Sequence, residues 1–383
     1  MKILYASERP PYPFFQGGAA RSAHYLMSIL AKDLAVECFS VGSKQFASSQ
    51  WSSPAPEEFA ALGISKIETT SERVSIRCGY NVEVVNDFEE TLLKIIDDRN
   101  PDVIWTQLDG AETVSRIARE KGKKVLAYLR DAEDSPAMLK SLARLGCCIV
   151  CNSRFMAQRV KKLTGKSARV IYPSLEESFG VSGDPLGYIT MINPFRVKGI
   201  DTFLEIAKRM PSENFLLVES WTLDAKGLAA LQGRLANLPN VRFLHRVPDV
   251  QEIYRQAKLV LVPSVWEEAF GRVVIEAQSC RIPVIASRRG GLPEAVGEGG
   301  ICVRDYLNAD AWVAEIQRVL SDPITYRALA GLAHDHATGH KFSTQHAARQ
   351  FLEICNDRSL FGATTSSGLR TWFSRLRNIA RGD

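Results

Sequence analysis

Short apolar runs alternate with amphipathic segments along most of this chain. Residues 2–6 form a run typical of a strand, and a polar loop with Gly17 and Gly18 leads into apolar residues at helical spacing. Apart from a less regular stretch at 43–86, the alternation continues to residue 171. Repeated strand–helix units of this kind predict a mostly parallel sheet with helices on both faces. We therefore expect an α/β fold.

A stretch rich in Pro, Ser, Gly and acid interrupts the alternation at 172–187, and the pattern restarts afterwards. Such a stretch is typical of a linker between domains. The pattern predicts an N-terminal Rossmann-like domain at 1–172, a linker at 173–187 and a second Rossmann-like domain at 188–340. A helix at 341–357 is expected to pack back on the first domain. The chain then continues as a basic amphipathic tail at 358–383.

The composition fits a soluble protein of two domains. The chain has 383 residues, of which 45% are hydrophobic and 24% charged. The first residues, MKILYA, are typical of a strand rather than a signal peptide, and no apolar run approaches the roughly 20 residues that span a bilayer. We expect a cytoplasmic protein, or one attached to the inner membrane face only at its surface.

The net charge of +5 is concentrated in the tail, where 358–383 holds five Arg and one Asp. The body is nearly neutral, which disfavours a nucleic-acid-binding surface. Residues 369–381 have apolar side chains at helical spacing with Arg on the other side. A helix of about 12 residues is marginal alone in water. The tail is therefore expected to rest on an anionic membrane or on the protein itself, and both alternatives stay open.

Three of the eight Cys lie close together. Cys147, Cys148 and Cys151 contain a C-x-x-C spacing, but no second pair accompanies it, and they lie in an apolar run. The pattern favours buried strand residues over metal ligands.

The most informative stretch is 263–286, which reads PSVWEEAFGRVVIEAQSCRIPVIA. It predicts a strand end, an acidic loop, a short helix and a second strand, with Glu268 and Glu276 near one helix N-terminus. Helix N-termini suit phosphate or sugar oxygens, and carboxylates accept hydrogen bonds from vicinal hydroxyls such as those of ribose. The alternative is a pair of solvated acids.

Two neighbouring loops carry further candidates. Gly290, Gly291 and Glu294 follow the next strand and should lie at the same edge. Arg196 and Lys198 follow the first strand of the second domain. Two cations near a helix start suit a diphosphate leaving group, on which negative charge develops.

In the first domain, candidates are identified only by their position at strand ends and at the first helix, because ligands of such sheets bind beyond the carboxyl ends of strands. They are Arg130, Asp131, Asn152, Ser153, Gly17, Gly18, Arg21 and His24. A plain turn explains the Gly pair equally well.

Four segments together, QGGAARS (16–22), KGID (198–201), PSVWEEAFGRVVIEAQSCRIPVIAS (263–287) and GGLPE (290–294), resemble the retaining glycosyltransferases of family 4. The resemblance extends to about Cys355. It implies the GT-B fold, with two Rossmann-like domains facing a cleft. A nucleotide-sugar donor would be held mainly by the C-terminal domain and the acceptor by the N-terminal one.

The resemblance also assigns roles. Glu268 would contact the donor sugar, Glu276 the ribose hydroxyls, and Lys198, with Arg196, the diphosphate. A further group would line the sugar and phosphate pocket through its backbone: Phe270, Gly271, Arg272 and Val273.

This chain departs from the family at two places. Family members usually have Arg and Lys about five residues apart where Arg196 and Lys198 are two apart. Many members also carry a His where this chain has 128–131, YLRD. Arg130 and Asp131 are the candidates to replace that His.

The implied reaction is transfer of a sugar from a UDP- or GDP-sugar to an acceptor hydroxyl with retained configuration, in glycan, polysaccharide or glycolipid assembly. The leaving diphosphate would help to deprotonate the acceptor, and no metal or other cofactor is expected. Two alternatives remain: a GT-B nucleotide-sugar epimerase or hydrolase, and a catalytically silent binding subunit of a glycan assembly complex. A nicotinamide-dependent dehydrogenase is disfavoured, because no G-x-G-x-x-G follows the first strand.

Overall fold

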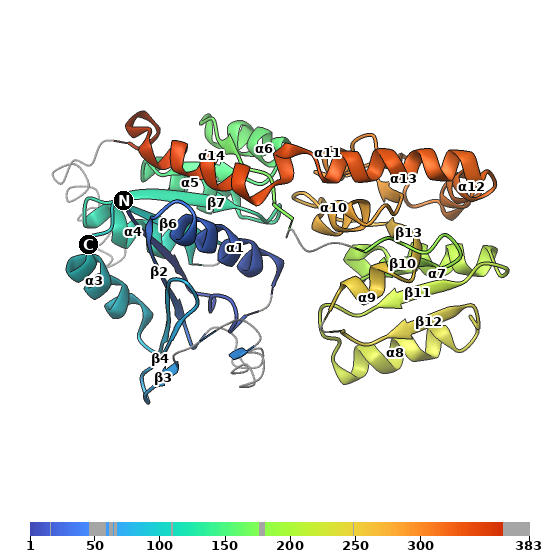
Figure 1. The fold of residues 1–383 in the computed structure, drawn as a ribbon, viewed down its shortest axis with the longest axis horizontal. Coiled ribbons are helices and arrows are strands. Elements are labelled where there is room, and N and C mark those ends of the chain that lie inside the picture. Colours follow the sequence, from blue (N-terminus) through green and yellow to red (C-terminus); the bar gives the residue numbers. More distant parts are fainter. Residues whose placement is uncertain are drawn as a thin grey trace, which may run out of the picture. The chain divides into compact units, whose positions relative to one another are not determined.

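The computed structural model describes residues 1–15, 17–45, 59–60, 64, 67–108, 110–175, 181–247 and 249–362. Its internal packing divides the chain into two compact units. The first unit is Met1–Tyr172 together with the segment from Thr344 onward, and the second is Pro173–Ser343. Each unit is a sheet covered by helices (Figure 1). The predicted tail helix at 369–381 lies outside the described residues.

The sheet of the first unit has the strand order β3-β4-β5-β2-β1-β6-β7-β8-β9. All neighbouring strands are parallel except at β3, β4 and β5, which pair in antiparallel fashion with one another. The strands are β1 (Lys2–Ser7), β2 (Glu37–Ser43), β3 (Ile67–Thr69), β4 (Arg73–Arg77), β5 (Asn81–Val85), β6 (Val103–Gln107), β7 (Lys124–Leu129), β8 (Cys148–Cys151) and β9 (Arg169–Val170).

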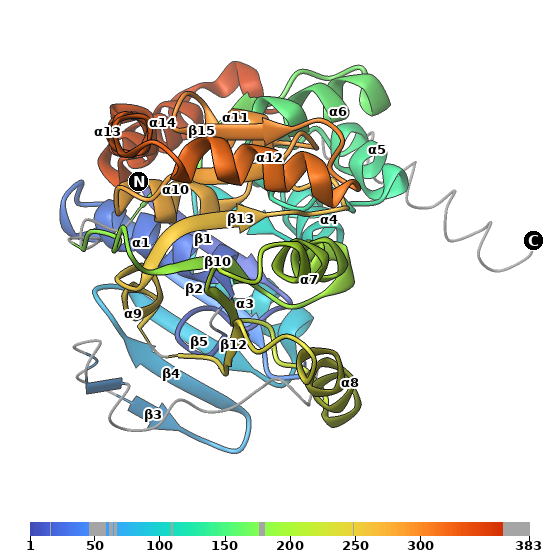
Figure 2. The same ribbon diagram turned by 90° about the vertical axis from the view of Figure 1, so that its right-hand side faces the viewer.

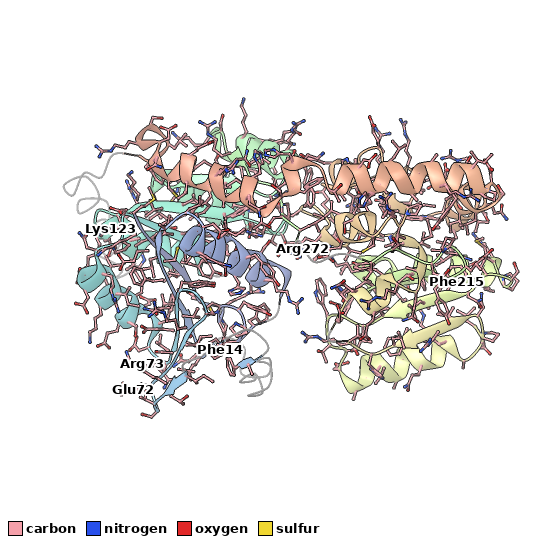
Figure 3. All side chains as sticks on the ribbon, in the orientation of Figure 1. Phe14, Glu72, Arg73, Lys123, Phe215 and Arg272 are labelled. Carbon is pink, nitrogen blue, oxygen red and sulfur yellow. The ribbon has the colours of Figure 1, made fainter. Side chains whose placement is uncertain are left out.

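The antiparallel strands correct the expectation of an irregular region at 43–86. In β4, Val74 and Ile76 are buried while Arg73 and Arg77 are exposed, which is the period of two that a half-buried strand requires. The strands form the edge of the sheet (Figure 2), and Glu72 in the turn that connects β3 and β4 precedes Arg73, the first residue of β4 (Figure 3). Each of β4 and β5 has only five residues, and so short an alternation is a weak sequence signal.

Helices of the first unit include one from the far end of the chain. They are α1 (Gly18–Lys32), α3 (Phe88–Arg99), α4 (Ala111–Glu120), α5 (Pro136–Arg144), α6 (Arg154–Thr164), α14 (Thr344–Asn356) and the short η3 (Arg358–Leu360). Helix α14 buries Ala348, Phe351 and Cys355 in the same core as β1 and α1. The Phe351 ring lies 5.0 Å from that of Trp105, measured between centroids. Residues 341–343, which were expected to belong to this helix, are part of the second unit.

Strand β8 contains the closely spaced cysteines. Cys148 and Cys151 are buried in it and Cys147 is buried just before it. Burial raises the pKa of Cys147 to about 11 and those of Cys148 and Cys151 to about 12, so the three thiols are protonated at neutral pH. The interpretation as buried strand residues is confirmed.

The sheet of the second unit is entirely parallel, with the order β12-β11-β10-β13-β14-β15. Its strands are β10 (Tyr188–Ile192), β11 (Phe215–Val218), β12 (Val241–Leu244), β13 (Ala257–Val262), β14 (Val284–Ser287) and β15 (Gly300–Val303). Numbered within the unit, the order is 3-2-1-4-5-6, so the winding reverses between β10 and β13. In open α/β sheets, ligands bind beyond the carboxyl ends of the strands at such a switch point.

Helices cover both faces of this sheet (Figures 1 and 2). They are α7 (Ile200–Arg209), α8 (Ala225–Leu235), α9 (Gln251–Tyr254), α10 (Arg272–Ser279), α11 (Leu292–Val296), α12 (Ala309–Leu320) and α13 (Pro323–Ala337), with short turns η1 (Arg196–Lys198) and η2 (His340–Phe342). On one face, α7 and α12 pack together over Phe215 (Figure 3), whose ring meets that of Phe203 edge to face at 5.5 Å. On the other face, α10 packs against α13.

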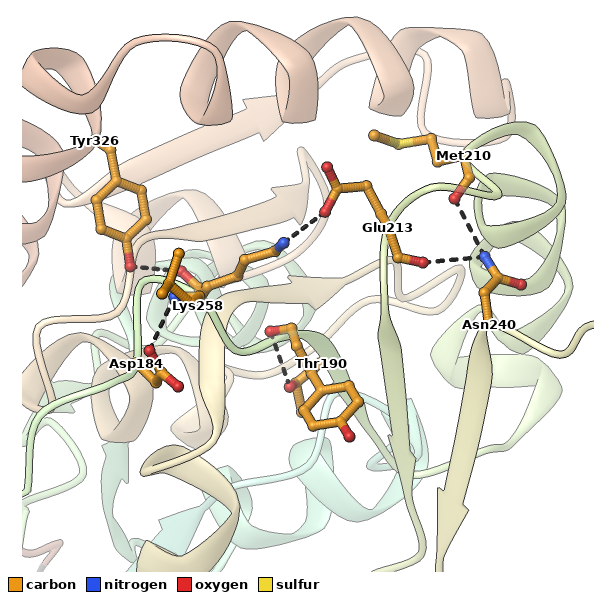
Figure 4. A network of polar contacts seen from close by, with 9 residues as sticks. Asp184, Thr190, Met210, Glu213, Asn240, Lys258 and Tyr326 are labelled. Atoms are coloured by element: carbon orange, nitrogen blue, oxygen red, sulfur yellow. Dashed lines mark hydrogen bonds and ion pairs between the residues drawn. The ribbon is translucent and has the colours of Figure 1, made fainter.

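A polar network joins β13 to the turn before β11 (Figure 4). Lys258 Nζ lies 2.5 Å from a carboxylate oxygen of Glu213, and the Asn240 side-chain amide donates to three backbone carbonyls of the 207–213 segment. The Asp184 amide donates to the Ala257 carbonyl, and the Gly183 amide to that of Cys280. The part of the expected linker at 183–187 is therefore built into the second unit.

His24 on α1, a candidate from its position in the sequence, is enclosed by aromatic side chains. Its Nδ1 lies 2.9 Å from the Tyr80 hydroxyl, its ring lies 4.9 Å from that of Tyr12, and the thiol of Cys78 is 4.0 Å away. Burial lowers the pKa of His24 to about 4. The ring is therefore neutral over most of the pH range of the folded protein.

This burial makes a prediction for stability. The unfolded chain, where the His pKa is about 6.5, takes up a proton before the folded chain does, so stability falls as the pH falls from about 6.5 to 4. We expect the wild type to lose about 2 kcal/mol more unfolding free energy between pH 7 and 4.5 than the variant His24→Gln. Urea titrations of both proteins at the two pH values measure this difference. Equal losses in the two proteins would contradict the lowered pKa of His24.

Candidate functional site

Two loops meet at the switch point of the second sheet, one after β10 and one after β13. The amides of Val265 and Trp266 both donate to the Val197 carbonyl, at 2.9 and 3.3 Å. Gly199 has φ +87°, and a Cβ on it would overlap the Pro263 carbonyl. The two loops are thus held in close backbone contact.

The closest charged contact across these loops joins Lys198 and Glu268. Lys198 Nζ lies 2.7 Å from Glu268 Oε1, and the Ser264 hydroxyl donates to the same oxygen at 2.8 Å. Both charged side chains are only 13% exposed. At this degree of burial each charge needs the other, because an unpaired ion would lose its hydration without compensation. The structure therefore brings together the two residues that were expected at the sugar and the diphosphate.

Glu276 lies one turn inside α10 and has a cation of its own. Arg272 Nε donates to its Oε1 at 2.9 Å, and the Tyr254 hydroxyl donates to its Oε2 at 3.0 Å. Burial, followed by the charge of Glu276, raises the pKa of Tyr254 well above 10, so this hydroxyl stays protonated. The carboxylate is held at both oxygens, and Arg272 Nη2 also lies 2.9 Å from Oε1.

Gly290 and Gly291 pack directly on the backbone of the acidic loop. The Gly291 amide donates to the Glu268 carbonyl at 2.7 Å. Gly290 has φ +57°, and a Cβ on it would lie 2.4 Å from that carbonyl oxygen. This pair therefore fixes the position of Glu268, and its expected contact with the donor stays a prediction. Glu294 lies on the following helix, α11.

Arg196 does not join Lys198, which corrects the expectation of two cations at one place. Its side chain is 88% exposed and its Nε lies 3.4 Å from Asp201 Oδ2. Both residues are in the 3₁₀ turn η1, where residues two apart point to different sides.

The side chains at the start of α10 have mostly structural positions. Phe270 is buried, with its ring 5.8 Å from that of Phe342. Gly271 has φ +101° and precedes Arg272, the first residue of the helix (Figure 3), with Val273 next. Their expected contacts through the backbone stay predictions.

Three first-unit candidates gather at the carboxyl ends of β7 and β8. Arg130 places its guanidinium 3.9 Å from the ring centroid of Tyr128, and the Asn152 side-chain amide donates to the Arg130 carbonyl at 3.4 Å. Asp131 accepts the Glu133 amide at 2.9 Å. Ser153 has a structural position, because its hydroxyl accepts the Met156 amide and caps α6.

The first helix is attached to the sheet by a residue that the sequence analysis missed. Gln107, at the end of β6, donates to the Tyr5 hydroxyl at 2.9 Å and to the Ala19 carbonyl at 3.1 Å. Gly17 precedes the helix with φ −68°, an ordinary value, and Gly18 is its first residue. Arg21 places its guanidinium 5.8 Å from the Tyr12 ring centroid.

Three further partners of the two carboxylates, Arg272, Tyr254 and Ser264, were not predicted from the sequence as such. The i, i+4 spacing of Arg272 and Glu276 on a predicted helix could have revealed their pair. No sequence signal links Tyr254 to Glu276 or Ser264 to Glu268, because these contacts depend on the fold.

The packing of Gly290 predicts that Gly290→Ala destabilises the protein by more than about 2 kcal/mol, since it combines a left-handed backbone with a steric overlap. Gly331→Ala is the matched control. It lies in α13 with open space around the added methyl group, and it should stabilise the helix by roughly 0.5 kcal/mol. Calorimetric melting of both variants tests this. Equal stability of the two variants would disprove the tight packing on Glu268.

Comparison with protein families matches residues 185–333 to the family described as Glycosyl transferases group 1. Two curated relatives are D-inositol 3-phosphate glycosyltransferases. The one from Segniliparus rotundus is 37% identical over 162 residues, and the one from Rhodococcus opacus is 42% identical over 159 residues. Each alignment covers 39% of this chain and 35% of the relative. The matched region thus spans about a third of the length of these relatives.

Solved structures match nearly the whole chain. A glycosyltransferase from Rickettsia africae has a TM-score of 0.71 at 18% identity, covering 93% of this chain and 98% of that one. Anabaena HepE, solved with UDP and glucose, has a TM-score of 0.73 at 17% identity, covering 93% of this chain and 100% of that one. Within the described part of this chain, no helix has the length and apolar character to cross a membrane.

These matches confirm the predicted α/β fold class with mostly parallel sheets. The second unit, which contains the Lys198–Glu268 pair, is the one whose residues 185–333 are similar to group 1 glycosyl transferases. The comparisons support the prediction of a glycosyltransferase enzyme with the fold of GT-B structures.

Proposed function

We propose that this protein transfers a sugar from a nucleotide diphosphate sugar, a UDP- or GDP-sugar, to an acceptor hydroxyl with retention of configuration. The observation that carries the proposal is the partly buried Lys198–Glu268 pair at the switch point of the second sheet. Its position in the segment similar to group 1 glycosyl transferases supports it, as does the fold shared with HepE, which was solved with UDP and with UDP-glucose.

The proposed roles follow from the charges of the two loops. The ammonium of Lys198 neutralises the negative charge that develops on the diphosphate as its bond to the sugar breaks. When Lys198 turns to the diphosphate, Glu268 is released to accept hydrogen bonds from sugar hydroxyls. Glu276 accepts from the ribose hydroxyls, held in place by Arg272 and Tyr254. Residues of the first unit bind the acceptor.

The finer assignments rest on the sequence motifs. The resemblance to family 4 supports retention, with the leaving diphosphate taking the proton of the acceptor hydroxyl. Lys198 and the amides at the start of α10 supply the positive charge, and we propose that no metal takes part. The acceptor belongs to glycan, polysaccharide or glycolipid assembly, and it is a glycan or a lipid-linked molecule.

A thermal-shift screen of nucleotide sugars tests the proposal, because a ligand that binds only the folded state raises the melting temperature. Product analysis with the stabilising donor alone separates the alternatives. A transferase leaves most of the donor intact, an epimerase converts it to an isomeric sugar, and a hydrolase releases free sugar. Stabilisation by no nucleotide sugar would instead favour a silent binding subunit.

The site makes a prediction about two variants. Lys198→Ala should mainly lower kcat, by about 100-fold, because it removes a charge that acts as the leaving group forms. Glu276→Ala should weaken donor binding by about tenfold or more, because it removes the acceptor of the ribose hydroxyls. Calorimetry and transfer assays measure the two effects.

Lys258→Ala is the matched control. The side chain of Lys258 is also 13% exposed and is paired with a Glu, Glu213. It lies in β13, in the polar network described above, and not in the loops at the switch point. It should lower stability and leave kcat within about twofold of the wild type. Normal turnover of the Lys198 variant and normal donor affinity of the Glu276 variant would reject the assigned roles.

We further propose that residues 369–381, outside the described part of the chain, bind an anionic membrane and bring the enzyme to the inner membrane face. Their Arg residues and apolar positions support this. The full chain should sediment with phosphatidylglycerol liposomes and less with phosphatidylcholine liposomes, while a chain truncated before Leu369 should stay in the supernatant. Equal sedimentation of both chains would reject membrane binding through this tail.

A further inference from the structure

Beside the Lys198–Glu268 pair lies an aromatic cluster that none of the assigned roles uses. It consists of Phe195, Trp221 and Trp266, which come from the loops after β10, β11 and β13. The ring centroids of Phe195 and Trp221 are 5.4 Å apart, and those of Trp221 and Trp266 are 5.9 Å apart. Lys198 Nζ lies 4.7 Å from the Trp221 centroid and 4.1 Å from the Trp266 centroid. Cation–π attraction thus joins this cluster to the candidate site.

Trp221 is exposed, although it belongs to a packed cluster. The residue is 43% exposed, while the side chains of Lys198 and Glu268 are 13% exposed. Single exposed apolar side chains are common on protein surfaces and need no explanation. An exposed indole in contact with the ammonium of the proposed catalytic Lys is different, because it adds an apolar surface to a site of charged groups.

The loop that carries Trp221 is held in one conformation. Asn193 has a left-handed backbone, with φ +73°, and its side-chain carbonyl accepts the Trp221 amide at 2.7 Å. The carboxylate of Glu219, nearly fully buried, accepts the Leu223 amide at 2.6 Å and lies 3.0 Å from His245 Nδ1. A left-handed Asn and a buried carboxylate are both unfavourable in isolation. Here they fix the position of one exposed ring, and a fixed ring loses little entropy when a ligand stacks on it.

Trp266 adds a second observation. Its indole Nε1 is buried and has no hydrogen-bond acceptor among the residues that the structure describes. A buried donor without an acceptor is unfavourable, because it has lost its hydrogen bond to water and gained none in return. An acceptor oxygen from a bound ligand would remove that cost.

We infer that Trp221 forms the wall of the donor-sugar subsite and stacks on the apolar C–H face of the sugar ring. A pyranose has such a face together with a rim of hydroxyls. The cluster offers the matching surfaces, an open indole beside a carboxylate and an ammonium. A nucleobase also stacks on indole but has no use for hydroxyl-binding groups next to the ring. This inference rests on the proposed function and adds to it a residue that binds the sugar ring.

Calorimetry on the full chain tests the inference with two pairs of probes, UDP-glucose against UDP and GDP-mannose against GDP. For the pair that binds, the ratio of the two dissociation constants isolates the contribution of the sugar. Trp221→Ala should weaken binding of the nucleotide sugar, relative to the free diphosphate, by about five- to tenfold. The affinity for the free diphosphate itself should stay within about twofold of the wild-type value. Trp221→Phe should keep most of the wild-type ratio, because it keeps a stacking face.

Two controls separate stacking from a structural role. Ile324→Ala removes another exposed apolar side chain, on α13, and should leave the ratio unchanged. In transfer assays Trp221→Ala should raise KM with kcat nearly unchanged, since stacking acts on the ground state and the transition state alike. A variant that only loosened Lys198 would lower kcat instead.

Each outcome bears on one conclusion. An unchanged ratio, or an equal loss of affinity for the free diphosphate, overturns the stacking role of Trp221 and leaves the proposed function intact. A wild-type protein that binds none of the four probes contradicts the proposed function, and this inference with it.

Discussion

The candidate site depends on one partly buried ion pair, between Lys198 and Glu268. Both groups have lost most of their hydration, and at 2.7 Å they compensate each other only while the two loops keep their relative position. The surrounding backbone explains how that position is kept. Gly199 allows the first loop to lie against Pro263, and Gly290 and Gly291 allow a third loop to lie against Glu268. Side chains at any of these glycines would push the loops apart and leave two unpaired charges.

The sheet order explains why the pair forms at this place. Lys198 follows β10 and Glu268 follows β13, two strands that are neighbours in space although about 65 residues separate them in the chain. Because the winding reverses between them, the connecting helices lie on opposite faces and leave the carboxyl ends uncovered. Trp221 follows β11, the next strand along, and therefore lies on the same edge. Lys198, seventy positions before Glu268 in the chain, can thus be its partner only because of the topology.

The sequence predicted the elements in which apolar residues recur at regular spacing. It also predicted the site residues that lie together in one continuous segment. Most strands and helices of the second unit, and the loop–helix arrangement of Glu268 and Glu276, follow from apolar spacing, whereas the helix α11 lies in a segment that the sequence predicted as a loop. Short alternating strands at β4 and β5 were missed, because five residues with a period of two resemble an irregular segment. Arg196 was grouped with Lys198 because they are near in sequence, whereas the 3₁₀ turn separates their side chains. Tyr254 and Trp221 contact the site through tertiary structure, so no local pattern reveals them.

The charges of the resting site also determine what a ligand must bring. Each carboxylate already has a cation, Lys198 for Glu268 and Arg272 for Glu276, so a neutral sugar gains little by approaching either one alone. A ligand that carries both a diphosphate and hydroxyls can exchange partners, because the phosphate replaces the carboxylate at Lys198 and the hydroxyls replace the ammonium at Glu268. In that exchange Lys198 keeps an anionic partner, and Glu268 receives hydrogen bonds from hydroxyls in place of the one from the ammonium. On the proposed function, the exchange therefore favours a nucleotide diphosphate sugar over its separate parts, since only the intact molecule offers a partner to both members of the pair.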